Sequence, residues 1–435
     1  MDKILIINGR VIDPVNKINK DLDVLIENGK IKKIGKNLLK TDGGHAQIID
    51  AKKKIVSPGF VDVHVHLREP GREDKETIHT ASRAAAKGGI TSVVGMPNTT
   101  PVADNQTVIE YVLSKAKKES LINIFVCGTI TKGQKGEELA EIWEMKKTGA
   151  VALSDDGSDI QNLDVYRKAM QYAKTYEMPI ISHTEDENLF HGGQIHEGKI
   201  SSKLGLQGIP ACAEDAATAR LITLVEDVDL PFHFSHVSTK GSVDLIRMAR
   251  KKKLKITADC TPHHFSLTDE SVKVFDTAAK VNPPLRSEDH RQALLQGLKE
   301  NVISIIATDH APHTWTEKER QFQDAPFGIV GFETMLSLII TNLVKKKVLT
   351  LEEAIAKITI NPARMLKINK GTLNVGSDAD LTIFDPEKTW IVDKTKFESK
   401  GMNSPFHGMK LYGVVTDTIV NGLVRVLDGN IIEDS

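Results

Sequence analysis

Residues 62–68 of the chain read Asp62-Val63-His64-Val65-His66-Leu67-Arg68. The valines before and between the histidines predict a β-strand, in which residues two apart share one face, so both imidazoles should point to the same side. Two imidazoles aimed at one place can bind a metal ion, but two structural histidines near a sheet end would give the same pattern. The choice depends on whether further ligands follow equivalent strands downstream.

The middle of the chain alternates short apolar runs with longer amphipathic stretches, as parallel βα units do. Eight runs are predicted as strands: Val61–Val65, Ser92–Gly95, Ile122–Val126, Ala150–Leu153, Pro179–Ile181, Phe232–Phe234, Lys255–Ala258 and Val302–Ala307. Helices are expected between them, for example at Glu76–Lys87, Glu137–Lys147, Val165–Tyr176 and Ala213–Leu224. Eight such units predict an α/β fold built as a closed (β/α)8 barrel of the TIM type.

Both chain ends differ from this middle part because they carry strand and turn signals without helices between them. Asn-Gly pairs, a strong hairpin signal between apolar runs, stand at Asn8-Gly9, Asn28-Gly29 and Asn421-Gly422. Neither end has enough strands to bury a face alone, so we expect both to pair into one small composite β-sandwich domain. The predicted division gives residues 1–55 and 367–435 to the β domain and 56–366 to the barrel.

Composition excludes several classes of protein. Lys and Arg (57) nearly balance Asp and Glu (58) among the 435 residues, which argues against a nucleic-acid or anionic-membrane partner. Three scattered cysteines, Cys127, Cys212 and Cys260, give no disulfide framework and suit a reducing compartment. The first apolar run, Ile4–Ile7, is too short for a signal peptide or a membrane span. We therefore expect a cytoplasmic protein.

Polar residues capable of chemistry follow every predicted strand. In barrel order they are His64, His66 and Arg68, then Asn98, Thr129, Asp155 and Asp156, His183, His236, Asp259 and Thr261, and Asp309. The carboxyl ends of barrel strands converge on one mouth, so four histidines and at least two carboxylates are expected to meet there. This convergence favours a metal site over independent structural histidines.

The size of this ligand set predicts two metal ions. A single catalytic zinc uses three protein ligands and a water, whereas four imidazoles and two carboxylates fit two ions that share a bridging carboxylate. Imidazole-rich ligation without thiolates favours Zn²⁺, although ligand type alone leaves Mn²⁺ and Fe²⁺ open.

Two segments, Asp62–Gly71 and Ala307–His313, resemble signatures of dihydroorotases of the long bacterial and archaeal type, within the cyclic amidohydrolases. Gly95–Thr99, Asn282–Arg286 and Asn361–Ala363 extend the resemblance over nearly the whole chain. It implies a zinc-dependent enzyme that reversibly closes N-carbamoyl-L-aspartate to (S)-dihydroorotate and water, a step of pyrimidine (UMP) biosynthesis.

The resemblance also implies the metal ligands. His64 and His66 would bind one ion, and His183 and His236 the other. Asp309 would contact the first ion and act as general base, taking a proton from a bridging hydroxide and passing it to the departing ring nitrogen. Neighbouring families bridge their ions with a carbamylated lysine, but this strand end reads Ala152–Gly157 without a lysine. Strand phase favours Asp156 over Asp155 as the bridging ligand.

Substrate contacts follow from the charge of dihydroorotate, whose ring carboxylate is best neutralised by a guanidinium group. Arg68 lies just beyond the metal-binding histidines. A lone arginine after a strand more often forms a surface ion pair, and the resemblance reverses that preference in favour of the carboxylate role. The resemblance adds further substrate contacts: His66, Asn98 and His313, then Asn282, Phe327 and Gly328.

The segment Thr314–Asp324, rich in charged residues, is expected either to cover the mouth as a mobile loop or to be an ordinary solvated connection. The other histidines considered are expected to be structural rather than metal ligands: His233, His263, His264, His310 and His407.

Two rival functions remain to be tested. A hydantoinase or allantoinase acts on rings without the carboxylate, so Arg68 and the missing lysine speak against it. A catalytically dead scaffold would be expected to have lost metal ligands, and here each is present. The partner expected is a small-molecule substrate, and a homodimer and an association with aspartate transcarbamoylase stay open.

Overall fold

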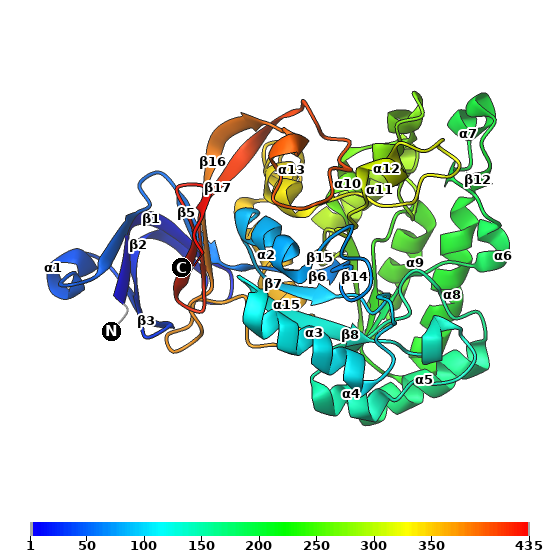
Figure 1. The fold of residues 1–435 in the computed structure, drawn as a ribbon, viewed down its shortest axis with the longest axis horizontal. Coiled ribbons are helices and arrows are strands. Elements are labelled where there is room, and N and C mark those ends of the chain that lie inside the picture. Colours follow the sequence, from blue (N-terminus) through cyan, green and yellow to red (C-terminus); the bar gives the residue numbers. More distant parts are fainter. Residues whose placement is uncertain (1–2, 434–435) are drawn as a thin grey trace.

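Two sheets account for most strands in the computed structural model, which describes residues 3–433 (Figure 1). Over this described range, the larger α/β part contains eight parallel strands in the order β15-β14-β13-β10-β9-β8-β7-β6. In chain order these strands are β6 (Phe60–Val65), β7 (Ile90–Gly95), β8 (Asn123–Gly128), β9 (Ala152–Leu153), β10 (Ile180–Ser182), β13 (Phe232–Phe234), β14 (Ile256–Cys260) and β15 (Ile305–Ile306). Each lies on one of the predicted apolar runs, so the predicted barrel is confirmed.

The first and last strands approach each other and nearly close the barrel. The amide of His66 donates to the carbonyl of His310 at 2.9 Å, and Val65 forms an isolated parallel bridge with His310. Below this contact the buried carboxylate of Asp62 accepts from the amide of Thr308 at 3.1 Å. The opening motif therefore supplies the closing contact of the barrel as well as two histidines.

Helices surround this barrel (Figure 1). Helix α2 (Ile78–Lys87) begins two residues later than predicted because Thr77 caps it, forming a capping box with Thr80. The other predicted helices are found as α4 (Ile142–Thr148), α5 (Leu163–Thr175) and α8 (Ala211–Val228), although α4 begins five residues later than the predicted Glu137. The short helix α1 (Leu38–Asp42) lies instead beside β1 and β2 of the second sheet (Figure 1). The remaining α-helices are α3 (Gln106–Glu119), α6 (Glu187–Phe190), α7 (Lys199–Leu204), α9 (Lys240–Lys251), α10 (Pro262–Ser266), α11 (Glu288–Lys299), α12 (Trp315–Lys318), α13 (Met335–Ile339), α14 (Leu351–Lys357) and α15 (Ile360–Leu366). Across residues 3–433, no helix combines the length and apolar character that a membrane crossing would require.

Strands from both chain ends form the second sheet, which has nine strands among the described residues. Its main path runs β19-β18-β17-β16-β5-β1-β2-β3, and β4 pairs with β1. The strands are β1 (Lys3–Asp13), β2 (Ile18–Glu27), β3 (Lys30–Gly35), β4 (Gln47–Asp50), β5 (Ile55–Pro58), β16 (Leu381–Ile391), β17 (Lys410–Val420), β18 (Leu423–Leu427) and β19 (Asn430–Ile431). Antiparallel pairing of β5 with β16 joins the two ends, as expected for a composite β domain, while its exact boundaries stay a prediction.

One of the three predicted Asn-Gly hairpins is wrong. Asn28-Gly29 connects β2 to β3 and Asn421-Gly422 connects β17 to β18, and all four residues have positive φ, as hairpin turns need. Asn8-Gly9 instead lies inside β1, where the pairing with β2 shifts register between Ile6 and Gly9. The positive φ of Asn8 thus serves a β-bulge within one long strand rather than a turn.

Candidate active site

The carboxyl ends of the barrel strands bring the predicted histidines and two aspartates together. The Nε2 atom of His64 lies 3.2 Å from Oδ1 of Asp156, and the Nε2 atom of His66 lies 3.1 Å from Oδ1 of Asp309. His183 and His236 face each other across 3.1 Å between Nδ1 and Nε2. Every predicted metal ligand therefore lies in one buried cluster, which we call the histidine-aspartate cluster.

Unusual backbone conformations aim several of these side chains. Arg68, His236 and Asp309 have φ values of 61°, 37° and 48°, in the left-handed region that non-glycine residues rarely adopt. The His236 amide is held by a 2.8 Å hydrogen bond to Asp259. Such conformations cost free energy and gather at functional sites, where the surrounding structure maintains them.

Charge within the cluster is dominated by its two carboxylates. Burial lowers the pKa of His64, but the carboxylates of Asp156 and Asp309 raise it, and the net shift is upward to about 10. Burial alone would raise the pKa of Asp156, yet His64 and His236 hold that pKa well below its usual value. The two carboxylates therefore favour positive charge in contact with them, either as protons on the imidazoles or as metal ions.

The cluster fits metal ions by its unsatisfied atoms and by its ligand spacing. Four of its buried side-chain atoms make no hydrogen bond: Nδ1 and Nε2 of His64, Nδ1 of His236 and Oδ1 of Asp156. In the described part of the chain, two groups of ligand atoms lie within 4.8 Å of one another: His64, His66 and Asp156, and then Asp156, His183 and His236. Imidazole nitrogens and carboxylate oxygens are ordinary zinc ligands, and Asp156 is common to both groups.

The neighbouring aspartates Asp155 and Asp156 point to different partners. The Asp155 carboxylate accepts hydrogen bonds from the amides of Ile130 and Thr131 at 2.7 and 3.2 Å and from the Thr131 hydroxyl, which ties β8 to β9. Asp156 faces His64 and His66 instead. This geometry supports the preference for Asp156, whose role as a bridging ligand stays a prediction.

A cavity of about 220 Å³ opens beside the histidine-aspartate cluster. Its lining includes every predicted site residue except His64, which lies beneath it: His66, Arg68, Asn98, Asp156, His183, His236, Asn282, Asp309, His313, Phe327 and Gly328. Gly157, Val281 and Ala311 also line it and were not predicted. We call this cavity the substrate pocket.

Hydrogen-bond donors form one wall of the substrate pocket. The Arg68 guanidinium donates through Nε to the Pro312 carbonyl at 3.1 Å, and its Nη2 atom lies 3.2 Å from Nε2 of His313. The Asn98 carbonyl oxygen lies 2.9 Å from Nδ1 of His66. Because that contact uses the oxygen, the Asn98 amide nitrogen stays available to an acceptor in the pocket.

The pocket lining also contains the residues predicted to contact ring amides: Asn282, and Phe327 and Gly328 next to His313. The Asn282 amide nitrogen lies 3.4 Å from Nε2 of His183 and donates to the Glu185 carboxylate at 3.2 Å. Gly328 has φ 145°, and a Cβ atom there would lie 2.7 Å from the Ala311 carbonyl oxygen. A side chain at Gly328 would therefore strain this part of the pocket.

The segment Thr314–Asp324 is tied to the body of the barrel by buried lysines. The Lys280 ammonium donates to the carbonyls of Phe322 and Gln323 at 2.6 and 3.0 Å, and the Lys318 ammonium donates to the Pro326 carbonyl at 2.8 Å. The segment starts with α12, beside His313. Its predicted mobility is a question of dynamics and stays a prediction.

Histidines that we expected to be structural have other partners. His233 contacts Asp259 at 2.7 Å and Thr257 at 2.8 Å, and His310 stacks on Phe332 with ring centroids 3.7 Å apart. The Nδ1 atom of His407 accepts a backbone hydrogen bond at 3.3 Å. The adjacent rings of His263 and His264 pack together with centroids 4.5 Å apart.

Sequence reasoning missed the charged residues behind the pocket wall. Lys75 lies in the turn before α2, with its ammonium 3.0 Å from both Nδ1 of His313 and Oε1 of Glu317. Arg72 also reaches Glu317 at 3.0 Å. The only available signal was proximity to the opening motif, because a lysine in a charged turn normally indicates a solvated surface.

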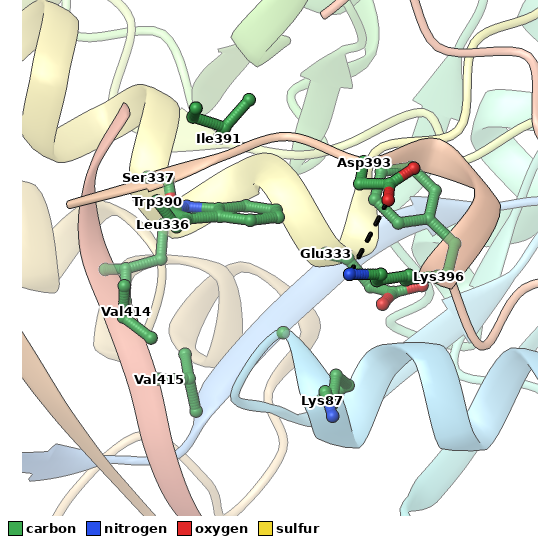
Figure 2. Close-up of a pocket in the computed structure, with 12 residues that line it drawn as sticks. Lys87, Glu333, Leu336, Ser337, Trp390, Ile391, Asp393, Lys396, Val414 and Val415 are labelled. Carbon is green, nitrogen blue, oxygen red and sulfur yellow. Dashed lines mark hydrogen bonds and ion pairs between the residues drawn. The ribbon is translucent and has the colours of Figure 1, made fainter. Parts of the chain in front are cut away.

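A second cavity, of about 330 Å³, lies away from the strand ends, between the end of α2, helix α13 and strands β16 and β17 (Figure 2). We call it the junction cavity. Its lining is largely apolar: Lys87, Gly88, Glu333, Leu336, Ser337, Trp390, Ile391, Asp393, Lys396, Phe397, Val414 and Val415. The Trp390 indole donates to the Ser337 hydroxyl at 2.9 Å, and the Glu333 carboxylate accepts from the Glu398 amide at 2.8 Å. Burial raises the pKa of Glu333 to about 8.

Two family models match the sequence. The model described as dihydro-orotase-like matches residues 53–242, and the model of the amidohydrolase family matches residues 324–426. These matches cover the strand ends that carry His64 to His236 and most of the C-terminal strands.

Curated relatives match nearly the whole chain. A dihydroorotase of Pelotomaculum thermopropionicum is 51% identical and covers 98% of this chain and 99% of its own length. Dihydroorotases of Geobacter metallireducens and Acetivibrio thermocellus are 50% and 49% identical, each over 97% of this chain and over 99% and 98% of their own lengths.

Solved structures of related enzymes have the same overall fold. An L-hydantoinase (dihydropyrimidinase) from Arthrobacter aurescens aligns with a TM-score of 0.90 and 26% identity, over 100% of this chain and 98% of that one. A dihydropyrimidinase from Brevibacillus agri aligns with a TM-score of 0.86 at 23% identity, over 99% and 96% of the two chains, which shows the fold alone.

Proposed function

The chain belongs to the dihydroorotase family, and we propose that it catalyses the reversible, zinc-dependent cyclisation of N-carbamoyl-L-aspartate to (S)-dihydroorotate and water, in the cytoplasm and within pyrimidine biosynthesis. One observation carries the proposal. The histidine-aspartate cluster and a wall of carboxylate-binding donors face the same small pocket, with Asp309, His66 and Arg68 among its lining residues.

Arg68, Asn98 and His313 would orient the substrate through its ring carboxylate. Arg68 presents guanidinium N–H groups beside Nε2 of His313, and burial lowers the pKa of Arg68 only to about 10, so it stays a cation near neutral pH. The Arg68 cation and the neutral groups beside it would bind the ring carboxylate of the substrate and so fix the orientation of the ring in the pocket.

The residues that would hold two zinc ions are His64, His66, Asp156, His183, His236 and Asp309, and Asp156 belongs to both groups of closely spaced ligand atoms. When bound, paired divalent ions of this kind polarise an amide carbonyl and lower the pKa of water. The buried atoms of His64, His236 and Asp156 that lack hydrogen bonds support this assignment. Mn²⁺ or Fe²⁺ would use the same ligands.

Asp309 would move the proton of the reaction. Its Oδ1 atom lies 3.1 Å from Nε2 of His66 and within the lining of the pocket, so it can reach both the attacking water and the ring nitrogen. In the hydrolytic direction Asp309 would take a proton from the water and give it to the departing nitrogen. Asn282 and the backbone of Phe327 and Gly328, which line the same pocket, would hold the ring amides.

Hydantoinase activity is the second candidate, because the solved L-hydantoinase has a very similar fold. Its support is weaker for two reasons. Identity to the curated dihydroorotases is about twice as high, and the strand end at Ala152–Gly157 carries Asp156 but no lysine.

A substrate panel tests the proposal. The purified, zinc-loaded protein should hydrolyse dihydroorotate and cyclise N-carbamoyl-L-aspartate, with kcat/KM for dihydroorotate at least about 1000-fold above that for hydantoin or allantoin, since a missing charged group leaves buried donors unpaired. Turnover of either neutral ring without turnover of dihydroorotate would overturn it.

A further inference from the structure

One wall of the substrate pocket is contacted from outside by a segment of the C-terminal part of the chain. Residues 399–403 lie in the connection between β16 and β17, two strands of the second sheet. Gly401 packs directly on the pocket wall, since a Cβ atom there would lie 2.7 Å from Cβ of Pro312. Two residues further on, Asn403 is only 4% exposed. A polar side chain this deeply buried needs hydrogen-bond partners.

Asn403 bonds to the backbone of two chain segments that line the pocket. Its side-chain nitrogen donates to the carbonyls of Ala311 at 2.9 Å and Gly328 at 3.0 Å. Its side-chain oxygen accepts from the amide of His313 at 3.1 Å, and its backbone carbonyl accepts from the amide of Val330 at 3.1 Å. Ala311, His313 and Gly328 all belong to the pocket lining, so one residue outside the pocket holds both segments.

The partners leave only one orientation for the Asn403 side chain. The two carbonyls can only accept and the backbone amide can only donate, so the side-chain nitrogen must face the carbonyls and the oxygen must face the amide. Exchanging the two atoms would place acceptors against acceptors and a donor against a donor. Because buried groups left without partners cost free energy, these three bonds fix the two segments relative to each other.

The segments that Asn403 holds also hold Arg68. Between Ala311 and His313, the Pro312 carbonyl accepts from Nε of Arg68 at 3.1 Å. Asn403 bonds to the residue on each side of Pro312 and therefore determines where this carbonyl points. A displacement of about 1 Å in a binding group can cost about 100-fold in rate, even when the altered residue is remote from the chemistry.

A direct contact between the two segments does not replace these bonds. The Ala311 amide donates to the Ile329 carbonyl at 3.0 Å, which joins the segments at one point. That bond holds neither the His313 amide nor the Gly328 carbonyl, both of which bond to Asn403. Without Asn403, the part of the wall beside Arg68 would lose its support from behind.

We propose that Asn403 is a positioning residue for substrate binding, which holds the Ala311–His313 turn and Gly328 so that Arg68 is placed to bind the substrate carboxylate. The connection between β16 and β17 would then complete a pocket that the barrel strands alone do not fix. The role in substrate binding rests on the proposed function, whereas the hydrogen bonds of Asn403 do not.

Steady-state kinetics of the zinc-loaded protein gives the first test. Asn403→Ala should raise KM for dihydroorotate at least about tenfold and change kcat less than about threefold, because the wall binds the substrate without reacting. Asn403→Asp keeps the shape of the side chain and the acceptor for His313 but lacks the two N–H donors, so it should raise KM as well. Equal KM values for wild type and a folded Asn403 variant would overturn the proposal.

Asn123→Ala is the matched control. The Asn123 side chain donates to the Thr91 carbonyl at 2.9 Å and accepts from Asn421 at 2.8 Å, so it also joins the barrel to the C-terminal strands. It stands at the start of β8, at the end of the barrel opposite the pocket. Its loss should lower the melting temperature and leave KM unchanged. If both Asn403 variants fail to fold while Asn123→Ala folds, Asn403 has a purely structural role and the proposal is wrong.

Hydrogen exchange of backbone amides, followed by NMR, gives a readout that needs no substrate. The His313 amide should be protected in wild type and should exchange at least about tenfold faster in Asn403→Ala, which removes its acceptor. The His66 amide, which donates to the His310 carbonyl, should keep its rate. Unprotected exchange of the His313 amide in wild type, or the same rate in the variant, would contradict the positioning role.

The two proposals can fail separately. If wild type does not turn over dihydroorotate, the proposed function fails, and the exchange of the His313 amide still tests the contact with Asn403. If wild type is active but neither KM nor the exchange rate responds to Asn403→Ala, the positioning role alone fails.

Discussion

The substrate pocket and the junction cavity show that the larger of two cavities need not be the one with the catalytic groups. The junction cavity is the larger, about 330 Å³ against about 220 Å³, and its walls are mainly apolar. The substrate pocket is small and lined by four histidines, two aspartates and an arginine from different strand ends. Each is lined by a carboxyl group, buried Asp156 in the substrate pocket and half-buried Glu333 in the junction cavity, and the surroundings move the two pKa values in opposite directions.

These opposite shifts have a physical cause. In the junction cavity, burial dominates and raises the pKa of Glu333 to about 8, so the neutral form is favoured. In the substrate pocket, the imidazoles outweigh burial and keep the pKa of Asp156 low, so the charged form is favoured. The charged carboxylate of Asp156 can bind a cation, whereas the neutral carboxyl group of Glu333 carries no charge to attract one and accepts a backbone hydrogen bond from Glu398. Matched substitutions of the two carboxyl groups therefore sharpen the comparison.

The largest effect is expected for Asp156→Asn. Loss of the carboxylate shared by both ligand groups should remove at least one metal ion per chain and lower kcat/KM for dihydroorotate by at least about 1000-fold. Metal analysis and steady-state kinetics measure both. Glu333→Gln is the control at the other cavity and should keep wild-type metal content and activity.

Asp309→Asn should have the second-largest effect on activity. The amide keeps the shape of the side chain but cannot take a proton, so kcat should fall by about 100-fold to 10 000-fold, the usual contribution of a general base. Metal content should fall less than in Asp156→Asn, because Asp309 belongs to neither of the two ligand groups among residues 3–433. A variant with near wild-type kcat would exclude Asp309 as the base.

Arg68→Met should act mainly on binding. Removing the guanidinium group should raise KM for dihydroorotate about 10-fold to 100-fold, as expected for lost hydrogen bonds to a charged group. Arg167→Met is a suitable control because its side chain is 46% exposed, pairs with Asp227 and does not line the pocket. Equal KM values for wild type and Arg68→Met would contradict the carboxylate role.

The smallest effect concerns stability. Glu333 has a folded-state pKa of about 8 against an ordinary value of 4.5, so the folded protein holds its proton more tightly than the unfolded chain. The stabilisation of the folded state by protonated Glu333 is fully present below about pH 4.5 and is lost as pH rises to about 8; the full shift corresponds to at most about 5 kcal/mol. Urea unfolding of wild type and Glu333→Gln at pH 5 and pH 8 measures this, and the glutamine variant should lose that part of the pH dependence. The same pH dependence in both proteins would exclude Glu333 as its source.

The barrel and the gathering of the candidate ligands at one mouth could be predicted because they depend on regular strands. Apolar runs set the strand positions, and period two together with parallel pairing places His64, His183 and His236 at one mouth. The alternation of side chains along the strand also favoured Asp156 over Asp155 as the ligand. In the structure the Asp155 carboxylate accepts from the Thr131 hydroxyl after the neighbouring strand.

Other features depend on contacts that local sequence does not encode. Asn8-Gly9 has the composition of a hairpin turn, but long-range pairing with β2 and β4 keeps it inside β1 as a bulge. Lys75 is in a charged turn typical of a surface, and it is buried only because His313 and Glu317, more than 200 residues away, pack over it. Tertiary contacts of this kind have no short-range signal.

Zinc titration of the metal-depleted protein, with dihydroorotate hydrolysis followed at each addition, tests the central claim most directly. The histidine-aspartate cluster predicts no turnover without metal and a rise that saturates at about two equivalents per chain, one for each ligand group. Full activity in the metal-free protein, or no dihydroorotate hydrolysis at full metal loading, would contradict the account.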